Sequence, residues 1–262
     1  MLPDSTESTL AGNNIIVTGA AQGVGLGIVE ELLNQGANVV MLDRDADALA
    51  ASADKVGANC ENTVLSFATD VTDIDGVRSS FESAREQMGS LDGLVNNAGI
   101  IHMGSAVDST NDDWLSQMNV NVVGVVNCCN AFRESSNGSG SIVNIASNAG
   151  KVGYPNMAGY NASKAAVISL TRTLAAEWAP SINVNAVCPG GVLTPMLAHV
   201  ADVIGTDIGE NPDELLATMV PAQLKRHIQP REVGKVIAFL LSDAAVIIRG
   251  QSINVDGGDT PY

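Results

Sequence analysis

The chain has 262 residues, of which 45% are hydrophobic and 16% are charged, a composition that suits one sizeable folded domain and excludes disorder as its main state. Thirteen lysines and arginines against 29 aspartates and glutamates give a formal net charge of −16 at pH 7. Phosphate backbones and anionic membrane surfaces would repel such a protein, so neither nucleic acid nor a membrane is expected as a partner.

Targeting and membrane segments are not expected either. The first residues lack the basic and apolar regions of a signal peptide. No apolar run approaches the roughly 18 residues of a membrane span. The four cysteines, at positions 60, 128, 129 and 188, form no CxxC pair, so we expect reduced thiols and a cytoplasmic protein.

Short apolar segments alternate with longer amphipathic segments along the chain. The apolar segments predict buried strands at residues 14–18, 38–42, 63–67, 92–96, 141–146, 182–188 and 252–255. The amphipathic segments predict helices at residues 24–35, 45–56, 74–88, 111–134, 158–178 and 231–241. This alternation predicts an α/β fold with a doubly wound parallel sheet of about seven strands flanked by helices.

A glycine-rich loop lies between the first predicted strand and the first predicted helix. It reads Thr-Gly-Ala-Ala-Gln-Gly-Val-Gly over residues 18–25. Glycines permit the tight turn and let a pyrophosphate reach the free N–H groups at the start of a helix. The alternative is an ordinary glycine-rich turn, but the strand before and the helix after favour a dinucleotide cradle. The loop therefore predicts a single-domain Rossmann fold.

Asp43 ends the second predicted strand, 18 residues after Gly25. An acid at about this distance accepts both ribose hydroxyls of NAD and repels the 2′-phosphate of NADP. Gln22 is neutral where a basic residue would help NADP, whereas Arg44 could hold that phosphate. We therefore expect NAD, with NADP less favoured. The alternative is that Asp43 caps the helix that begins near Asp45, and both roles can hold together.

Tyr160 and Lys164 are four residues apart at the start of a helix, which places them on one face. A close ammonium lowers the pKa of a phenol, which can then exchange a proton near the operating pH. The alternative is a plain surface contact. Ser147 follows the fifth strand, where its hydroxyl can bond a substrate oxygen. The alternative for Ser147 is a cap of the turn at residues 147–150.

Together these motifs resemble the short-chain dehydrogenase/reductase family over about residues 10–258. The matching segments are Thr18–Gly25, Asn96–Gly99, Asn121–Gly124, Ser147, Tyr160–Lys164, Pro189–Gly190 with Thr194, and Gly250–Gly258. The resemblance implies one domain over residues 1–262, with a cofactor half at about 10–140 and a catalytic and substrate half at about 141–258. Residues 195–230 are less regular and contain four prolines, so we expect them to form a lid.

The resemblance also implies a catalytic tetrad, whose members are Asn121, Ser147, Tyr160 and Lys164. Asn121 would help to hold a water in a proton relay through the lysine. The alternative for Asn121 is a buried amide bonded to a neighbouring turn.

Further cofactor contacts are implied by the same resemblance. Asp70 and Val71 would line the adenine, although Asp70 could instead cap the helix that begins near Thr72 to Asp75. Asn97 and Gly99 would line the ribose, and Val192 and Thr194 the carboxamide. The expected cofactor-binding residues are altogether Gly19, Gln22, Gly23, Val24, Gly25, Asp43, Arg44, Asp70, Val71, Asn97, Ala98, Gly99, Tyr160, Lys164, Pro189, Gly190, Val192 and Thr194.

Substrate contacts are expected from the loops at 100–104, 148–157 and 191–230. The candidates are Asn148, Tyr154, Asn156 and Met196, a mixture that suits a polyol, a cyclic alcohol or another small secondary alcohol and its ketone. Lys151 is expected to be solvated. No metal-ligand cluster is recognisable.

The sequence therefore predicts an oxidoreductase that transfers a hydride between NAD(H) and a secondary alcohol or ketone, with Tyr160 as general acid and base. The alternatives are a 3-ketoacyl thioester reductase that uses NADPH, a non-enzymatic dinucleotide sensor, and an epimerase or dehydratase of the longer sugar-nucleotide branch.

By resemblance we expect a homotetramer, with one interface formed by the helices at 111–134 and 158–178. The second helix carries an apolar stripe at Ala165, Ile168, Leu170 and Leu174, which could equally face the sheet.

Overall fold

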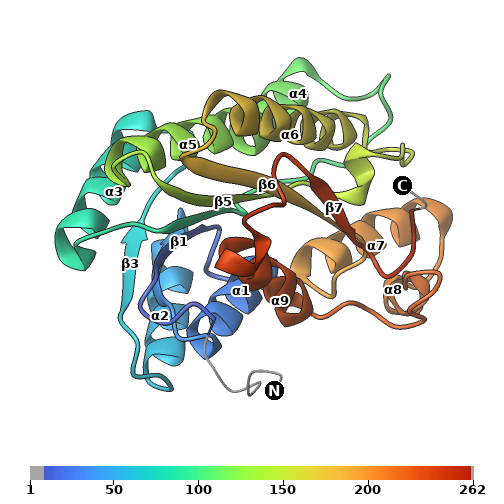
Figure 1. Ribbon diagram of the computed structural model, residues 1–262. Helices are drawn as coiled ribbons and strands as arrows, with labels where there is room; N and C mark the ends of the chain where they lie inside the picture. Colours follow the sequence, from blue (N-terminus) through green and yellow to red (C-terminus); the bar gives the residue numbers. More distant parts are fainter. Residues whose placement is uncertain (1–8, 261–262) are drawn as a thin grey trace.

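Seven parallel strands form one sheet in the computed structural model, which describes residues 9–260 (Figure 1). The strands are β1 (Asn14–Thr18), β2 (Asn38–Asp43), β3 (Val64–Ala68), β4 (Gly93–Asn96), β5 (Gly140–Ile145), β6 (Ile182–Pro189) and β7 (Ser252–Val255). Their order across the sheet is β3-β2-β1-β4-β5-β6-β7. Each strand overlaps a predicted one, and the predicted α/β fold is confirmed.

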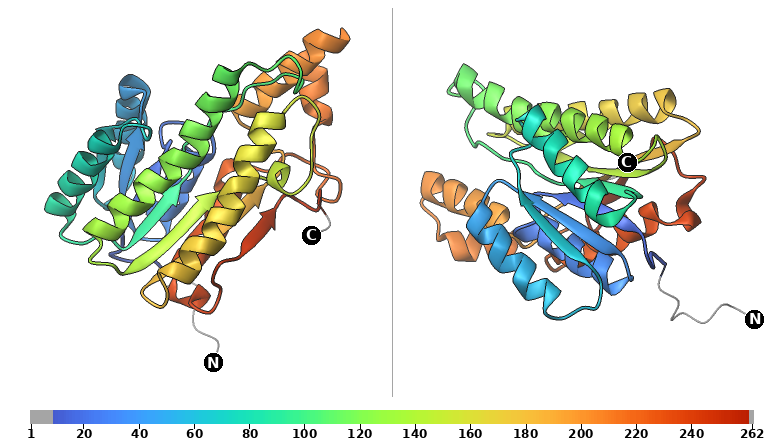
Figure 2. Two further views of the ribbon diagram at one scale, coloured as in Figure 1. Left: turned by 90° about the horizontal axis from the view of Figure 1, so that it is seen from above. Right: turned by 90° about the vertical axis from the view of Figure 1, so that its left-hand side faces the viewer.

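The helices cover both faces of the sheet (Figures 1 and 2). One face carries α1 (Gly23–Asn34), α2 (Ala46–Gly57) and α9 (Pro230–Leu241). The other carries α3 (Ile74–Met88), α5 (Gly124–Ser135) and α6 (Ala158–Glu177), with α4 (Asn111–Met118) beside α6.

Apolar residues fill both layers between sheet and helices, because side chains alternate along each strand. Ile15 and Val17 of β1 belong to the core under α1 and α9, whereas Ile16 belongs to the core under α3 and α5. Continuous β-branched runs are therefore needed in the central strands, as the sequence has them.

The segment predicted as one helix at 111–134 is not a continuous α-helix, so the prediction was wrong for the middle of this range. Residues Asn119–Val123 form a π-helical turn between α4 and α5. Such a turn inserts an extra residue into a helix and often marks a functional site. Here it carries Asn121, whose amide bonds to chain segments outside the helix.

The segment expected to be a lid contains two helices, α7 (Pro195–Ile208) and α8 (Pro212–Thr218). Each begins at a proline that follows a capping side chain: Thr194 accepts from the N–H of Leu197, and Asn211 accepts from those of Asp213 and Glu214. A proline at the first helical position suits this arrangement, because its missing N–H is not needed there.

The apolar stripe on α6 is divided between the inside and the outside of the protein. Ile168 and Leu174 are buried in the core beneath α6, whereas Ala165 is exposed. The buried half of the stripe thus faces the sheet, which was the alternative to an interface. Within residues 9–260, no helix is both long and apolar enough to cross a lipid bilayer.

The direction of the chain connections reverses between β1 and β4. β1 leads to β2 on one side of the sheet, whereas β4 leads to β5 on the other. In open parallel sheets a crevice forms beyond the carboxyl ends of strands at such a point.

Candidate active site

A cavity of about 690 Å³ opens at the carboxyl ends of the strands. Most predicted site residues line it, and they are Gly19, Gln22, Gly23, Val24, Asp43, Arg44, Asp70, Val71, Asn97, Ala98, Gly99, Ser147, Asn148, Tyr154, Tyr160, Lys164, Pro189, Gly190, Val192, Thr194 and Met196. Gly25, Asn121 and Asn156 are not among the lining residues. The cavity thus joins both halves of the chain.

The glycine loop forms one end of the cavity. Gly19 has φ +61°, and a Cβ there would lie 2.8 Å from the Cα of Ala98, so only glycine fits. Gln22 precedes α1 and makes no side-chain capping hydrogen bond, which leaves the helix N-terminus open toward the cavity. An open helix N-terminus with small residues around it fits a pyrophosphate.

Gly25 has a packing role that the sequence did not reveal. A Cβ on Gly25 would overlap the carbonyl of Gly19 and lie 2.6 Å from Nδ2 of Asn97. This glycine therefore allows α1 to pack closely against the loop, although it does not line the cavity.

Hydrogen bonds from the end of β4 hold the glycine loop in place. Oγ1 of Thr18 accepts from the backbone N–H groups of Asn97 and Ala98, both at 3.0 Å. Nδ2 of Asn97 donates to the carbonyls of Thr18 and Gly19 at 3.0 and 2.9 Å. Asn97 therefore lines the cavity and also fixes the position of the glycine loop.

Asp43 is anchored at the end of β2 by two backbone N–H groups. Its carboxylate accepts from Ala21 in the glycine loop at 3.0 Å and from Asp45 at 3.1 Å. The helix cap of α2 is Asp45, which accepts from Ala48. Because a carboxylate has about four acceptor positions, Asp43 can still accept hydroxyl groups from a ligand.

Asp70 does not cap α3, so the capping alternative was wrong. The cap is Asp73, which accepts from Asp75. Asp70 instead accepts from the N–H and hydroxyl of Thr72 at 2.9 and 2.7 Å. These hydrogen bonds, with a weaker contribution from the charge of Arg44, lower the pKa of Asp70. An ionised carboxylate therefore lies on the cavity wall.

Ser147 bonds to two parts of the site. Its Oγ accepts from the N–H of Ala149 at 3.1 Å and so caps a short 3₁₀ turn over Asn148–Gly150. The same side chain is hydrogen-bonded to that of Tyr160. The turn cap and the pairing with Tyr160 therefore occur together.

Lys164 is almost fully buried beside Tyr160. Its Nζ donates to the carbonyl of Ile145 at 2.8 Å and lies 5.7 Å from the centre of the Tyr160 ring. Burial lowers the pKa of Lys164 to about 8.

The pKa of Tyr160 does not follow the sequence expectation. Burial raises it, and the hydrogen bond with Ser147 lowers it by less. Lys164 is not among the causes, and its ammonium donates to the carbonyl of Ile145. In this structure the loss of solvent is therefore the dominant influence on the pKa of Tyr160.

Asn121 is a buried amide bonded to a neighbouring segment, which was the alternative to its role in a proton relay. Its Oδ1 accepts from the N–H of Ile100 at 2.8 Å, and its Nδ2 donates to the carbonyl of Ile100 and to Oγ of Ser163, both at 2.9 Å. A Cβ on Gly99 would lie 3.2 Å from Oδ1 of Asn121 and 3.4 Å from Nζ of Lys164. The amide of Asn121, in the π-helical turn, and the ammonium of Lys164, in α6, thus flank Gly99.

The substrate candidates lie in two different places. Nδ2 of Asn148 donates to the Tyr154 hydroxyl at 2.9 Å, and both residues line the cavity with Met196. Asn156 is exposed with φ +58°, and its carbonyl accepts from Gly104, so its prediction as a pocket residue was wrong.

Lining residues that were not named as candidates include Met219, Val220 and Asp259. The first two follow α8 inside the expected lid. Asp259 follows β7, in a tail with no pattern that indicates a pocket. Only the folding of the lid against this tail brings them to the cavity.

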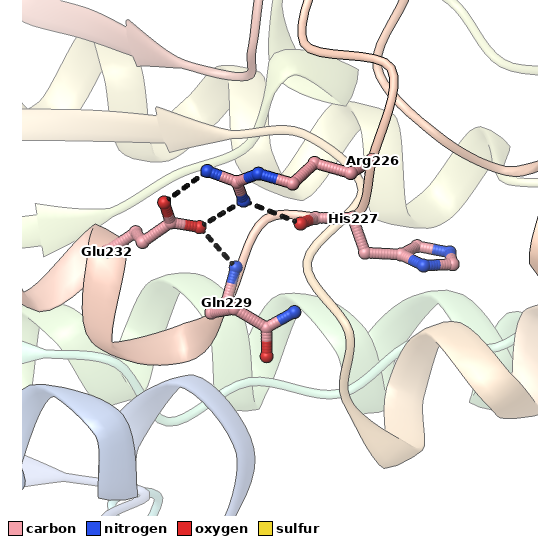
Figure 3. A network of polar contacts seen from close by, with 4 residues as sticks. All are labelled: Arg226, His227, Gln229 and Glu232. Atoms are coloured by element: carbon pink, nitrogen blue, oxygen red, sulfur yellow. Dashed lines mark hydrogen bonds and ion pairs between the residues drawn. The ribbon is translucent and has the colours of Figure 1, made fainter.

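Figure 3 shows how the end of the segment at 195–230 is fixed to α9. Glu232 accepts from both terminal nitrogens of Arg226, at 2.7 and 2.6 Å, and from the N–H of Gln229 at 2.8 Å. Arg226 also donates to the carbonyl of His227 at 3.0 Å. The hydrogen bonds from Arg226, and then that from Gln229, lower the pKa of Glu232 to about 2. Arg226 is thus occupied away from the cavity.

Metal ligands do not gather at this site. In the part of the chain from residue 9 to residue 260, no three histidine, cysteine, aspartate or glutamate side chains are placed to hold a metal ion.

Known proteins are similar to this chain in sequence and in fold. A family model described as "Enoyl-(Acyl carrier protein) reductase" matches residues 19–260. The chain is 39% identical over 252 residues to the cis-4-hydroxycyclohexanecarboxylate dehydrogenase of Sinomonas cyclohexanicum, which covers 94% of this chain and 95% of that protein.

Two solved structures extend the comparison. Actinorhodin polyketide ketoreductase with NADPH has a TM-score of 0.89 at 32% identity, over 95% of this chain and 98% of the other. NAD⁺-bound xylitol dehydrogenase has a TM-score of 0.88 at 30% identity, over 95% and 99%.

These similarities extend over nearly the whole chain and make it an oxidoreductase of CH–OH groups that uses a nicotinamide dinucleotide. The chain belongs to the short-chain dehydrogenase/reductase family, so the resemblance inferred from its motifs is confirmed.

Burial of Lys164 predicts a pH-dependent contribution to stability. The pKa of Lys164 falls from 10.5 to about 8 on folding, so between these values the unfolded chain binds more protons at this site. Folding stability therefore rises with pH across this window. The free energy of unfolding of the wild type, minus that of Lys164→Met, should increase by about 2 kcal/mol between about pH 7.5 and pH 10 in urea titrations. A pH-independent difference would contradict the burial of the charge.

Proposed function

We propose that this chain interconverts secondary alcohols and ketones with NAD(H), and that Tyr160 is the general acid and base. The observation that carries the proposal is the pairing of Ser147 with Tyr160 beside the buried Lys164, in the same cavity as the open N-terminus of α1. A proton-exchanging group and a dinucleotide cradle are the two parts that such a reaction needs.

The residues that would hold the dinucleotide line the cavity from the glycine loop to Thr194. The N-terminus of α1 would bind the pyrophosphate, Asp43 the adenosine ribose, and Asp70 with Val71 the adenine. Val192 and Thr194 would contact the carboxamide, and Lys164 the nicotinamide ribose. When bound, the nicotinamide ring accepts or supplies the hydride.

The chain's own groups would handle the proton and the oxygen. The substrate oxygen would bond to Oγ of Ser147 and to the hydroxyl of Tyr160, which are already bonded to each other. In alcohol oxidation Tyr160 would take the hydroxyl proton, and in ketone reduction it would return it. Ser147 would steady the charge that develops on the oxygen.

Lys164 and Asn121 would support this proton exchange. With a pKa of about 8, Lys164 is mostly an ammonium at neutral pH. In the structure its Nζ bonds to Ile145 and does not lower the pKa of Tyr160, so support of the phenolate would require the ammonium to act on the phenol in the ligand-bound site. Asn121 flanks Gly99 with Lys164, and we propose that it helps to hold a water there for a proton relay. Its bonds to Ile100 would keep that end of the relay rigid.

The preference for NAD is proposed from the charge at the end of β2. Asp43 is held in place by two backbone N–H groups and lines the cavity, so a 2′-phosphate would meet a fixed negative charge. Arg44 lines the same wall but also acts on Asp70. Gln22 adds no positive charge.

Tyr160→Phe tests the central assignment. The substitution removes the hydroxyl and leaves the ring, so we expect the catalytic efficiency to fall by about 10²–10⁴-fold, the usual contribution of a general acid or base. The assay is NADH formation by absorbance with polyols, cyclic alcohols and acyclic secondary alcohols. Retained NADH binding by fluorescence is the control for folding, and activity within threefold of the wild type would refute the role.

Asp43→Asn tests the cofactor preference. Loss of the carboxylate charge should lower the ratio of catalytic efficiencies for NAD over NADP by about 10-fold or more. Asp47→Asn removes a charge from the first turn of α2, outside the cavity lining, and should leave the ratio unchanged. Equal ratios in the wild type and in Asp43→Asn would assign the preference to other residues.

We also propose a homotetramer in the cytoplasm. Apolar side chains are exposed on α9 and just after it, with Phe239 at 44%, Val246 at 55% and Ile247 at 88%. Exposed apolar residues of this kind favour association. The four cysteines are free thiols, which suits a reducing compartment.

Sedimentation velocity tests the assembly. The wild type should sediment as a tetramer, and Ile247→Asp should shift the protein to smaller species because it places a charge in the proposed contact. A monomeric wild type at working concentration would contradict the proposal.

A further inference from the structure

Charged side chains line the two ends of the cavity unequally. Asp43, Arg44 and Asp70 lie at the ends of β2 and β3, on the side proposed for the adenosine. Lys164 is buried, with its Nζ bonded to a backbone carbonyl. On the side of Ser147, Tyr154 and the lid, the charged lining residue among residues 9–260 is Asp259.

Asp259 connects the end of the chain to the lid. Its Oδ1 accepts from the N–H of Ala222 at 2.7 Å, just after the lining residues Met219 and Val220. In Figure 1 the segment after β7 accordingly ends next to the one that follows α8. After burial, the charge of Asp259 is the largest cause that raises the pKa of Tyr154. The carboxylate therefore acts on the substrate side of the cavity.

Nearby cations do not neutralise this carboxylate. Nζ of Lys151 donates to the carbonyl of Ser252 at 2.8 Å, and Lys151 is not a lining residue. Arg226 is paired with Glu232 at the base of the lid. None of the three salt bridges among residues 9–260 includes Asp259.

Asp256 is the other carboxylate near Tyr154, but its surroundings differ. It is buried and accepts from the N–H groups of Gly258 and Thr260 and from the Thr260 hydroxyl. Three donors disperse its charge, and its effect on Tyr154 is the smallest of the causes. Asp259 is exposed, accepts one hydrogen bond within residues 9–260, and has a larger effect on Tyr154 than Asp256 has.

Uncharged groups on the same side can bind a polar ligand. The Tyr154 hydroxyl accepts from Asn148, and within residues 9–260 its own proton has no hydrogen-bond acceptor. Met157, Leu197 and Met219 are apolar lining residues of the same cavity. This combination suits a hydroxyl, carbonyl or amide on a compact carbon skeleton, and it includes no cationic side chain that could pair with an anion.

We propose that Asp259 is a specificity-determining residue that excludes anionic substrates, so that the pocket selects uncharged secondary alcohols and ketones with a second uncharged polar group near Tyr154. This inference rests on the function proposed above. It separates this chain from relatives such as the one named for cis-4-hydroxycyclohexanecarboxylate, whose substrate carries a carboxylate.

The size of the effect follows from the exposure of Asp259. Two like charges several ångströms apart near a protein surface repel by an amount that corresponds to about 10-fold in affinity. Because Asp259 is exposed, salt should screen the repulsion.

Binding of a matched pair tests the proposal without turnover. Cyclohexanecarboxamide and cyclohexanecarboxylate have nearly the same shape and differ in charge, and their affinities for the protein saturated with NADH are measured by calorimetry. The wild type should bind the amide about 10-fold more tightly. Asp259→Asn keeps an oxygen to accept from Ala222 but removes the charge, and should bring the two affinities to within about threefold.

Two controls keep the test specific. Asp54→Asn removes a charge from an exposed residue in the last turn of α2, at the opposite edge of the sheet, and should leave the ratio of affinities unchanged. In the wild type, an increase in NaCl from about 0.05 to 0.5 M should reduce the ratio, an effect that requires no variant.

Turnover of cis-4-hydroxycyclohexanecarboxamide and the corresponding carboxylate is measured in parallel. A charge-dependent affinity ratio without turnover would refute the proposed reaction and leave the charge selection standing. Equal affinities in the wild type, an unchanged ratio in Asp259→Asn, or binding of neither compound would overturn the selection by Asp259.

Discussion

The junction of β1 with β4 is the constraint on which the rest of this site depends. Parallel pairing brings Thr18 and Asn97 to the same edge of the sheet, where four hydrogen bonds join the glycine loop to the end of β4. The chain connections diverge on either side of this pair, so helices cannot close over it. This junction sets the position of the cavity and of the open N-terminus of α1. It also sets the position of the strand ends that carry Asp43 and Ser147.

Burial governs the chemistry of the proposed catalytic residues. Asn121, Lys164 and Ser147 are 1%, 4% and 8% exposed, and each has a hydrogen-bond partner that offsets the loss of water. The same burial lowers the pKa of Lys164 and raises that of Tyr160. Burial of these polar groups reduces the stability of the fold, but it holds them in a fixed geometry for proton exchange.

Local sequence signals predicted most of the fold, because burial of strands and amphipathicity of helices leave their periods in the chain. The π-turn at Asn119–Val123 escaped prediction, since bonds from Asn121 to Ile100 and Ser163 accompany it and both are distant in sequence. The packing role of Gly25 and the hydrogen bonds that fix Asp70 were not predicted either. A close approach to Gly19 and a bond to Thr72 depend on where neighbouring atoms lie rather than on residue type.

The sequence by itself determined the order of strands and helices, the glycine cradle and the spacing of Ser147, Tyr160 and Lys164, because these depend on residues close together in the chain. Tertiary structure alone decided that Asn156 lies outside the cavity, that Met219, Val220 and Asp259 belong to it, and that burial controls the pKa of Tyr160. These features arise where the lid meets the tail and where α6 covers the sheet, and such contacts join segments far apart in sequence. Their energies depend on solvent exclusion and distance, which no local pattern encodes.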